Sequence, residues 1–415
     1  MRTTLTLISL VVFTQNASLG AITIPGADGS SGVLNITEDT TIDLSLAATG
    51  QWDAANSASG IYDAEKWAVV FNYSTVTIAE GATLTFTNHP SKAPVVWLVN
   101  GDVTIDGTVA LDGQDHQLAP LVAEGGPGGF RGAAGSFSGT PRASAGFGPG
   151  GGFRQGDAGT SGSYGTAVSN SPTYGNPSLI PLLGGSGGAG DPESGRGRGG
   201  GAGGGALLIA AAQGITINGE LRANGGAGID TGYSSYNDTG GGSGGGLRLV
   251  CDSLAGSGAL TALGGSGWQS GGLGRIRVER VANNSTLSLT PDPSVVPLSS
   301  GDTAVLWPPA TAPEVEILSI GGETAPADPR ASFGAEGADV SLGETTTTPI
   351  VIQTTNVEQA STVQVRITPR SDANATIIDA SVDTVVSTDP LVIQWTAELP
   401  VNTGYSAIQV KVVRP

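Results

Sequence analysis

The densest group of side chains that could do chemistry lies between positions 102 and 116. It contains Asp102, Asp106, Asp112, Asp115 and His116. Neighbouring carboxylates can bind Ca²⁺, for which Asp112 and Asp115 are the candidate ligands, or act as an acid–base pair on a glycosidic bond. Aspartate is also common in turns, where it bonds the local backbone without any catalytic role. We therefore assign no catalytic residue, and a calcium ion is the only cofactor to consider.

Other acid–base and nucleophilic groups are scarce. The chain of 415 residues has two histidines, one cysteine and three lysines. No zinc-ligand pair, phosphate-binding loop or nucleophile elbow is present. Cys251 follows Leu247 and Leu249 in an alternating segment, which predicts a buried, inert thiol. These counts make an enzyme the less favoured interpretation.

Aromatic residues are spread through the glycine-rich segments. They are Phe130, Phe137, Phe147, Phe153, Tyr164, Tyr174, Tyr233, Tyr236 and Trp268. Aromatic rings among Gly, Ser and Asn are typical of recognition loops, and flat rings can stack on sugars. Tyr233, Tyr236 and Trp268 are the candidate ligand-binding residues. The other interpretation, which we favour, is that most of these rings pin the segments onto the body of the protein.

The elements that must position these residues follow from internal similarity. VWLVNGDVTIDGTVALDG (96–113), LLIAAAQGITINGELRANGG (207–226) and LRLVCDSLAGSGALTALGG (247–265) share one pattern. Each has an apolar run, an alternating pair, a glycine and a second alternating pair, so Val103, Ile215 and Leu254 should be equivalent. Segments this short cannot bury their apolar faces alone, but they can when they stack in register. The pattern predicts an all-β protein whose main part is a right-handed parallel β-helix, or solenoid.

Long insertions follow the second alternating pair of each copy, so they should cluster at one corner of the solenoid. The largest, 113–206, is rich in glycine without a strict three-residue period, which argues against a collagen helix. Two interpretations remain for residues 125–206. We favour a mobile, low-complexity loop, and the other is an ordered wrap held by backbone contacts.

The ends of the chain suggest further units. Residues 1–20 have the basic start, apolar run and small residues of a signal peptide, so we expect a secreted or cell-surface protein. The solenoid should occupy 21–290, and the Pro- and Ser-rich stretch 291–313 should be a linker. Residues 314–415 contain about seven short strand-like runs, which indicates an immunoglobulin- or fibronectin III-like β-sandwich with Trp395 in its core.

Charge and hydropathy limit the partners. The formal net charge is −18, so the chain should repel a phosphate backbone and nucleic acid is excluded as a partner. No segment after residue 20 has the eighteen unbroken apolar residues that a membrane span requires. Extracellular polysaccharide and cell-surface components remain as possible partners.

GGGSGGGLRL (240–249), GGAGGGALLI (200–209) and the repeat at 96–113 resemble glycine-rich β-helical repeats of large secreted bacterial proteins. Those proteins are often regarded as adhesin-like, and Val315–Pro415 is similar to a β-sandwich module found beside them. The resemblance implies a non-catalytic structural or adhesive protein, and the aromatic residues of the Gly-rich loops indicate glycans as its ligands. The alternative is a carbohydrate-active enzyme of the β-helix type, a polysaccharide lyase or hydrolase.

Overall fold

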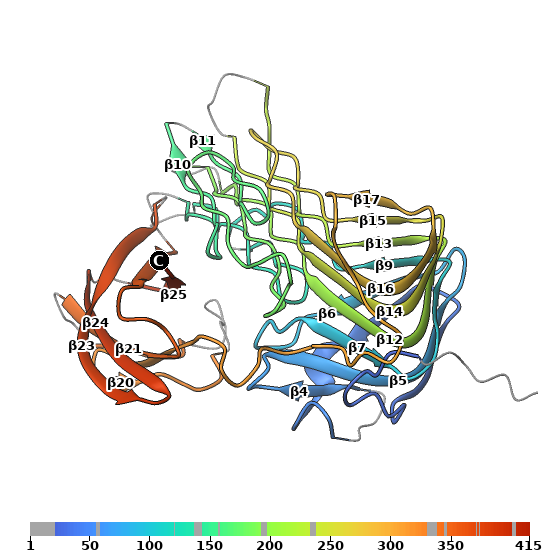
Figure 1. The fold of residues 1–415 in the computed structure, drawn as a ribbon. Coiled ribbons are helices and arrows are strands. Elements are labelled where there is room, and N and C mark those ends of the chain that lie inside the picture. Colours follow the sequence, from blue (N-terminus) through green and yellow to red (C-terminus); the bar gives the residue numbers. More distant parts are fainter. Residues whose placement is uncertain are drawn as a thin grey trace, which may run out of the picture.

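The protein is nearly all β-structure, as expected, with parallel sheets at one side and a curled antiparallel sheet at the other (Figure 1). The computed structural model describes residues 21–54, 59–119, 121–136, 143–156, 158–191, 197–232, 238–329, 338–343, 347–370, 372, 374–400 and 404–415. In these ranges the helical structure is one short 3-10 turn, Leu44–Leu46. No helix in the described ranges is long and apolar enough to cross a membrane.

Two sheets make up the parallel part. The ten-stranded sheet contains β1 (Gly32–Ile36), β3 (Ala48–Thr49), β4 (Ile61–Asp63), β5 (Ala68–Ile78), β7 (Val95–Val99), β8 (Val103–Ile105), β12 (Ala206–Ile217), β14 (Gly246–Gly256), β16 (Arg275–Ser285) and β18 (Ser294–Pro297). The six-stranded sheet contains β2 (Thr40–Asp43), β6 (Thr83–Thr87), β9 (Thr108–Ala110), β13 (Glu220–Arg222), β15 (Ala259–Thr261) and β17 (Ser288–Thr290). Every pair is parallel except β4 with β5.

The chain visits the two sheets alternately, so that β12 is followed by β13 and β14 by β15. We call one such pair of strands a level and the set of levels the stack. Ile215 lies opposite Val103 on one side and Leu254 on the other. Leu221 likewise lies between Val109 and Leu260. These pairings confirm the equivalence of the copies that the sequence pattern predicted.

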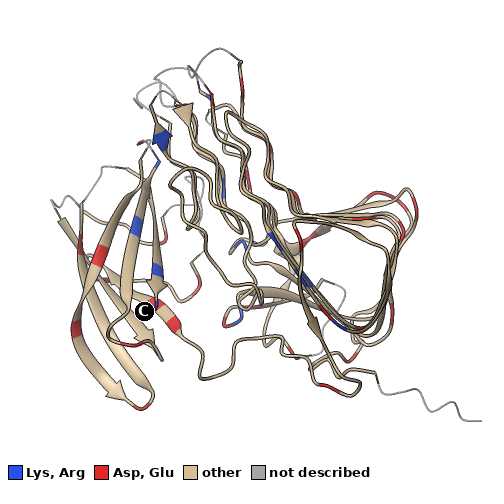
Figure 2. Ribbon diagram, turned by 45° about the horizontal axis from the view of Figure 1, so that its top comes forward, with Lys and Arg blue, Asp and Glu red and all other residues tan. Residues whose placement is uncertain are grey.

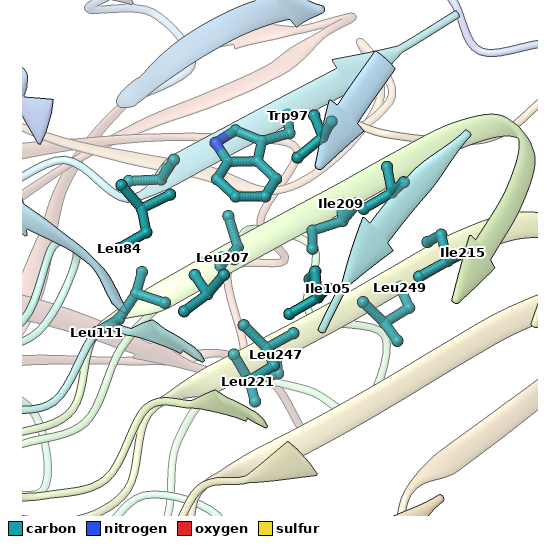
Figure 3. Packing of buried hydrophobic residues seen from close by; sticks show 14 of the residues in the cluster. Leu84, Trp97, Ile105, Leu111, Leu207, Ile209, Ile215, Leu221, Leu247 and Leu249 are labelled. Carbon is teal, nitrogen blue, oxygen red and sulfur yellow. The ribbon is translucent and has the colours of Figure 1, made fainter. Parts of the chain in front are cut away.

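The main core lies between the two parallel sheets. Alternation decides which side chains enter it: Val103 and Ile105 are buried, whereas Thr104 between them is half-buried and turned outward. Equivalent residues from successive levels, such as Leu207 and Leu247, stack on one another, and Leu207 and Ile209 lie beside Trp97 (Figure 3). Every level adds a few apolar side chains to one continuous interior, which is why no single short strand has to be stable alone.

A second apolar layer covers the outer face of the ten-stranded sheet. Val96, Leu208 and Val250 point to this side and are buried beneath Tyr164, Tyr174 and Leu306, with other residues of the same cluster. Burial on both faces explains why β7 is apolar at every position, since a parallel strand covered on both sides has no polar face.

Where the structure describes them, the glycine-rich segments are held by backbone hydrogen bonds, which corrects the favoured expectation of a mobile loop. Backbone N–H groups of Gly200 and Gly203 donate to one neighbouring segment, and those of Gly201 and Gly204 donate to a second. Ala202 and Gly205 donate to a third. Gly200 and Gly203 donate to the carbonyls of Ala133 and Phe130, Gly201 and Gly204 to those of Gly240 and Ser243, and Ala202 and Gly205 to those of Gln114 and Leu111. Such a three-residue recurrence matches the three residues per turn of a polyproline II chain.

The segments approach too closely for side chains. A Cβ at Gly203 would lie 1.9 Å from the carbonyl oxygen of Gly185, and one at Gly242 would lie 1.8 Å from that of Ala202. Glycine is therefore required by backbone-to-backbone contact. We call this set of hydrogen-bonded extended segments, drawn from 111–119, 121–136, 143–156, 158–165, 184–191, 197–205, 223–228, 239–246 and 262–274, the glycine bundle. A short hairpin, β10 (Arg154–Gln155) with β11 (Ala158–Gly159), lies at its edge.

The C-terminal part forms one curled antiparallel sheet. Its strands are β19 (Glu314–Ile320), β20 (Glu323–Thr324), β21 (Thr347–Thr355), β22 (Thr362–Pro369), β23 (Thr376–Thr388), β24 (Leu391–Pro400) and β25 (Ser406–Val413). The first part of β23 pairs with β22 and its second part pairs with β24, so this strand joins the two halves. Trp395 is buried as predicted, and its Nε1–H donates to Thr354 Oγ1 over 2.8 Å.

The connection between the parallel and antiparallel parts is itself packed. Within 291–313, expected to be a linker, β18 extends the ten-stranded sheet beside β16. The Val305 carbonyl then accepts a hydrogen bond of 2.6 Å from Arg248 Nη2. The antiparallel sheet also meets the glycine bundle, where the buried Arg366 donates from Nη2 to the carbonyls of Gly146 and Gly151 at 3.1 and 3.2 Å.

Candidate functional site

The four aspartates of the 102–115 cluster all accept hydrogen bonds from the neighbouring level of the stack. Their Oδ1 atoms accept hydrogen bonds from residues that are each 112 positions later in the chain. The donors are Gly214 N (2.9 Å) for Asp102, Asn218 Nδ2 (2.8 Å) for Asp106, Asn224 N (2.8 Å) for Asp112 and Ala227 N (2.7 Å) for Asp115. The constant interval shows that the cluster is spread along the edge of one level and does not converge on one point.

The same arrangement continues on the next level. Asn224, whose N–H is bonded by Asp112, accepts in turn from Leu263 N over 2.8 Å with its own Oδ1. An Asp or Asn at this corner thus satisfies a backbone donor that the short strands leave unpaired. Figure 2 shows acidic residues concentrated at the turns on the right of the view, along one side of the stack. This is the local, structural role that turn aspartates commonly have.

Asp112 has the most unusual environment of the four. Its Oδ2 lies 2.6 Å from Arg222 Nε, and the other side of that guanidinium lies 3.2 Å from Glu220 Oε2. Burial raises the pKa of the Asp112 carboxyl, although the hydrogen bond from Asn224 and the charge of Arg222 act in the opposite direction. A raised pKa is useful in a general acid, but Arg222 occupies the space between the two carboxylates.

The calcium site predicted at Asp112 and Asp115 gains no third carboxylate, His or Cys side chain from the described residues. No group of three or more His, Cys, Asp and Glu side chains that could hold a metal comes together in the ranges listed above. Each of the two carboxylates uses one oxygen to bind a backbone N–H. Binding of Ca²⁺ to these two residues stays a prediction.

The predicted ligand-binding aromatic residues are only partly visible. Tyr233 and Tyr236 lie outside the described residues. Trp268 is half-buried on the glycine bundle, with its backbone N–H 3.2 Å from the carbonyl of Thr239. Tyr164 and Tyr174 are buried against the ten-stranded sheet, and their hydroxyls donate to Leu183 and Gly184 carbonyls. For these two rings the pinning interpretation is confirmed.

A group of basic residues on the outer face of the stack was missed by the sequence analysis. Arg275 and Arg277 alternate on β16, and Arg277 lies beside Arg248 of β14. Glu279 contacts two of these three arginines, because its Oε1 lies 2.8 Å from Arg248 Nη2 and 3.1 Å from Arg277 Nε. The signal in the sequence is the alternation in RIRVE (275–279), which places both arginines and the glutamate on one face of a strand.

Comparison with known proteins identifies no relative. No protein-family model matches the chain, and neither a curated protein nor a solved structure is significantly similar to it. Its function must therefore be argued from the residues and their arrangement.

Proposed function

We propose that this chain is a secreted or cell-surface protein with a structural and adhesive role, built on a non-catalytic scaffold. The parallel strands would form a right-handed parallel β-solenoid, since parallel connections within a sheet are almost always right-handed. The C-terminal sheet would be an immunoglobulin- or fibronectin III-like β-sandwich, in which β23 crosses between the two layers. The apolar start at residues 1–20 would direct export.

The observation that carries this proposal is the use made of the carboxylates. Asp102, Asp106, Asp112 and Asp115 all bond the next level at one constant interval. Side chains with this role stiffen a scaffold and are poorly placed to converge on a substrate. The continuous core and the close-packed backbone of the glycine bundle also favour rigidity.

An extended rigid body suits the presentation of a contact face. The glycine bundle carries few charged side chains, and the exposed Ser266 and Ser270 lie beside the half-buried Trp268 on one segment with a hydrogen-bonded backbone. A preorganised surface loses little conformational entropy on binding. Neutral or weakly charged extracellular polysaccharide is the partner class that this surface fits best.

Retention of the full mature chain on polysaccharide and cell-wall fractions tests the proposal. We expect specific retention on at least one glycan, without any change in its length. The same incubation, with and without Ca²⁺, should be followed for new reducing ends or unsaturated products. Turnover that disappears in Asp112→Asn would instead establish the alternative, a β-helical carbohydrate-active enzyme. No retention on any fraction would contradict an adhesive role.

A further inference from the structure

The outer face of β16 carries an excess of positive charge in an acidic protein. Three guanidinium groups, those of Arg248, Arg275 and Arg277, lie on this face, and the Glu279 carboxylate pairs with two of them. The chain as a whole has a formal charge of −18, with 18 Lys and Arg residues against 36 Asp and Glu residues. A local reversal of charge of this kind is costly where side chains are half-buried unless an anion compensates it.

The three guanidinium nitrogens of Arg248 all have hydrogen-bond partners within the protein. Its side chain is 1% exposed, it pairs with Glu279, and its Nη1 and Nη2 atoms donate to the carbonyls of Leu306 and Val305. Glu279 is likewise committed, since it accepts from both Arg248 and Arg277. The single negative charge of the group is therefore already shared between two cations.

Arg275 and Arg277 keep unused donors. Arg277 donates from Nε to Glu279 and from Nη1 to Ser294 Oγ, which leaves its Nη2. Arg275 donates from Nη2 to the Tyr174 carbonyl over 3.0 Å and lies 5.4 Å from the centre of the Tyr164 ring. Its Nε is buried without a hydrogen-bond partner, and Arg275 takes part in no ion pair formed by the described residues.

We propose that Arg275 and Arg277 form a binding site for the carboxylate of a sugar acid. The two residues are two positions apart, so both side chains leave the same face of β16. A carboxylate accepts hydrogen bonds on two oxygens and matches the planar fork of an arginine. Tyr164 and Tyr174 hold Arg275 in place, which preorganises the site.

The negative charge of the whole protein limits how many negative charges the ligand can carry. A long polyanion would be repelled by the acidic surface around this patch, whereas one carboxylate on an otherwise neutral glycan would not. This inference rests on the proposed glycan-binding function and specifies its ligand as a glycan with isolated uronate or similar groups. Asp292, the acidic residue that precedes β18, forms no ion pair with either arginine in the described structure.

Binding of glucuronate to the full mature chain, measured by NMR saturation transfer and calorimetry, tests the site. We expect glucuronate to bind and glucose to bind at least tenfold more weakly, and we expect affinity to fall as salt is raised. Arg275→Gln should weaken glucuronate binding at least tenfold. Arg280→Gln is the matched control, because Arg280 lies on the same strand at the position of Cys251, on the opposite face.

The outcomes separate this site from the wider function. An equal loss of glucuronate affinity in both variants would overturn the assignment. Unchanged glucuronate affinity in Arg275→Gln, with unchanged thermal unfolding, would also overturn it. Inorganic sulfate that binds as tightly as glucuronate would overturn the preference for a carboxylate. Retention on neutral glycans without any glucuronate binding would refute this site and leave the adhesive function standing, whereas loss of both would remove the function too.

Discussion

Replacement of Gly203 by alanine should destabilise the glycine bundle strongly. The new Cβ would lie 1.9 Å from the Gly185 oxygen and 2.2 Å from its carbonyl carbon. Real contacts of this kind stay above 3.0 Å, so the neighbouring segment must move by about 1 Å. That displacement strains hydrogen bonds on both sides, among them Gly203 N to Phe130 O at 2.9 Å and Gly185 N to Gly204 O at 2.8 Å. Overpacking costs about 1–3 kcal/mol and each weakened hydrogen bond about 1 kcal/mol, so we expect a loss of about 3–5 kcal/mol.

Equilibrium denaturation of the purified variants measures this cost. Gly50→Ala is the matched control, because its Cβ would meet only the Ile61 side chain at an ordinary 3.6 Å. We expect that variant to unfold within about 0.5 kcal/mol of the parent. If Gly203→Ala were as stable as Gly50→Ala, the segments could not be packed backbone to backbone, and the ordered bundle would be wrong.

Three further predictions concern individual side chains. Arg366→Met should loosen the antiparallel sheet from the glycine bundle by about 2–4 kcal/mol, since it removes two charge-assisted bonds, and limited proteolysis should then cut sooner near 298–313. Asp112→Ala should cost about 1–2 kcal/mol by leaving Asn224 N unpaired, while Asp112→Asn should cost less. Burial raises the pKa of Asp112 in the folded state above the ordinary value of 3.8. The protonated carboxyl therefore contributes stability below pH 3.8, and this contribution declines as pH rises through the raised pKa. Asp112→Asn should flatten this decline in pH-dependent melting curves. Burial raises the pKa of Cys251 to about 12, so native thiol labelling at pH 8 should be at least about 10³-fold slower than that of the unfolded chain, and rapid native labelling would contradict a buried thiol.

Much of the fold could be predicted from the sequence because apolar and polar residues alternate along its strands. Val103, Ile215 and Leu254 sit at equal distances from the next alternating pair, and a period of two fixes which side faces inward. The role of the aspartates was only partly readable. Turn propensity indicated a structural role, but the 112-residue interval becomes meaningful only when the insertion 113–206 is known to return to the next level.

The glycine bundle and the basic site could not be predicted in the same way. Glycine content alone does not distinguish a mobile loop from a packed one, because the decisive contacts, such as Gly203 with Phe130, join residues far apart in the chain. Arg275 and Arg277 look like ordinary surface residues of an alternating strand. Their significance depends on Tyr174 and on β18, which reach this face from elsewhere in the sequence.

Disulfide cross-linking of outward positions tests the registered stack most directly. Thr104 lies opposite Thr216, and Thr216 lies opposite Ala255. Neighbouring strands are about 4.8 Å apart, which is within the Cα separation of about 4.4–6.8 Å that a disulfide needs, and strands two levels apart are not. We predict that Thr104→Cys with Thr216→Cys oxidises readily in the native protein, whereas Thr104→Cys with Ala255→Cys does not. Efficient cross-linking of the second pair, or none of the first, would contradict the stacked arrangement on which the scaffold and its binding face depend.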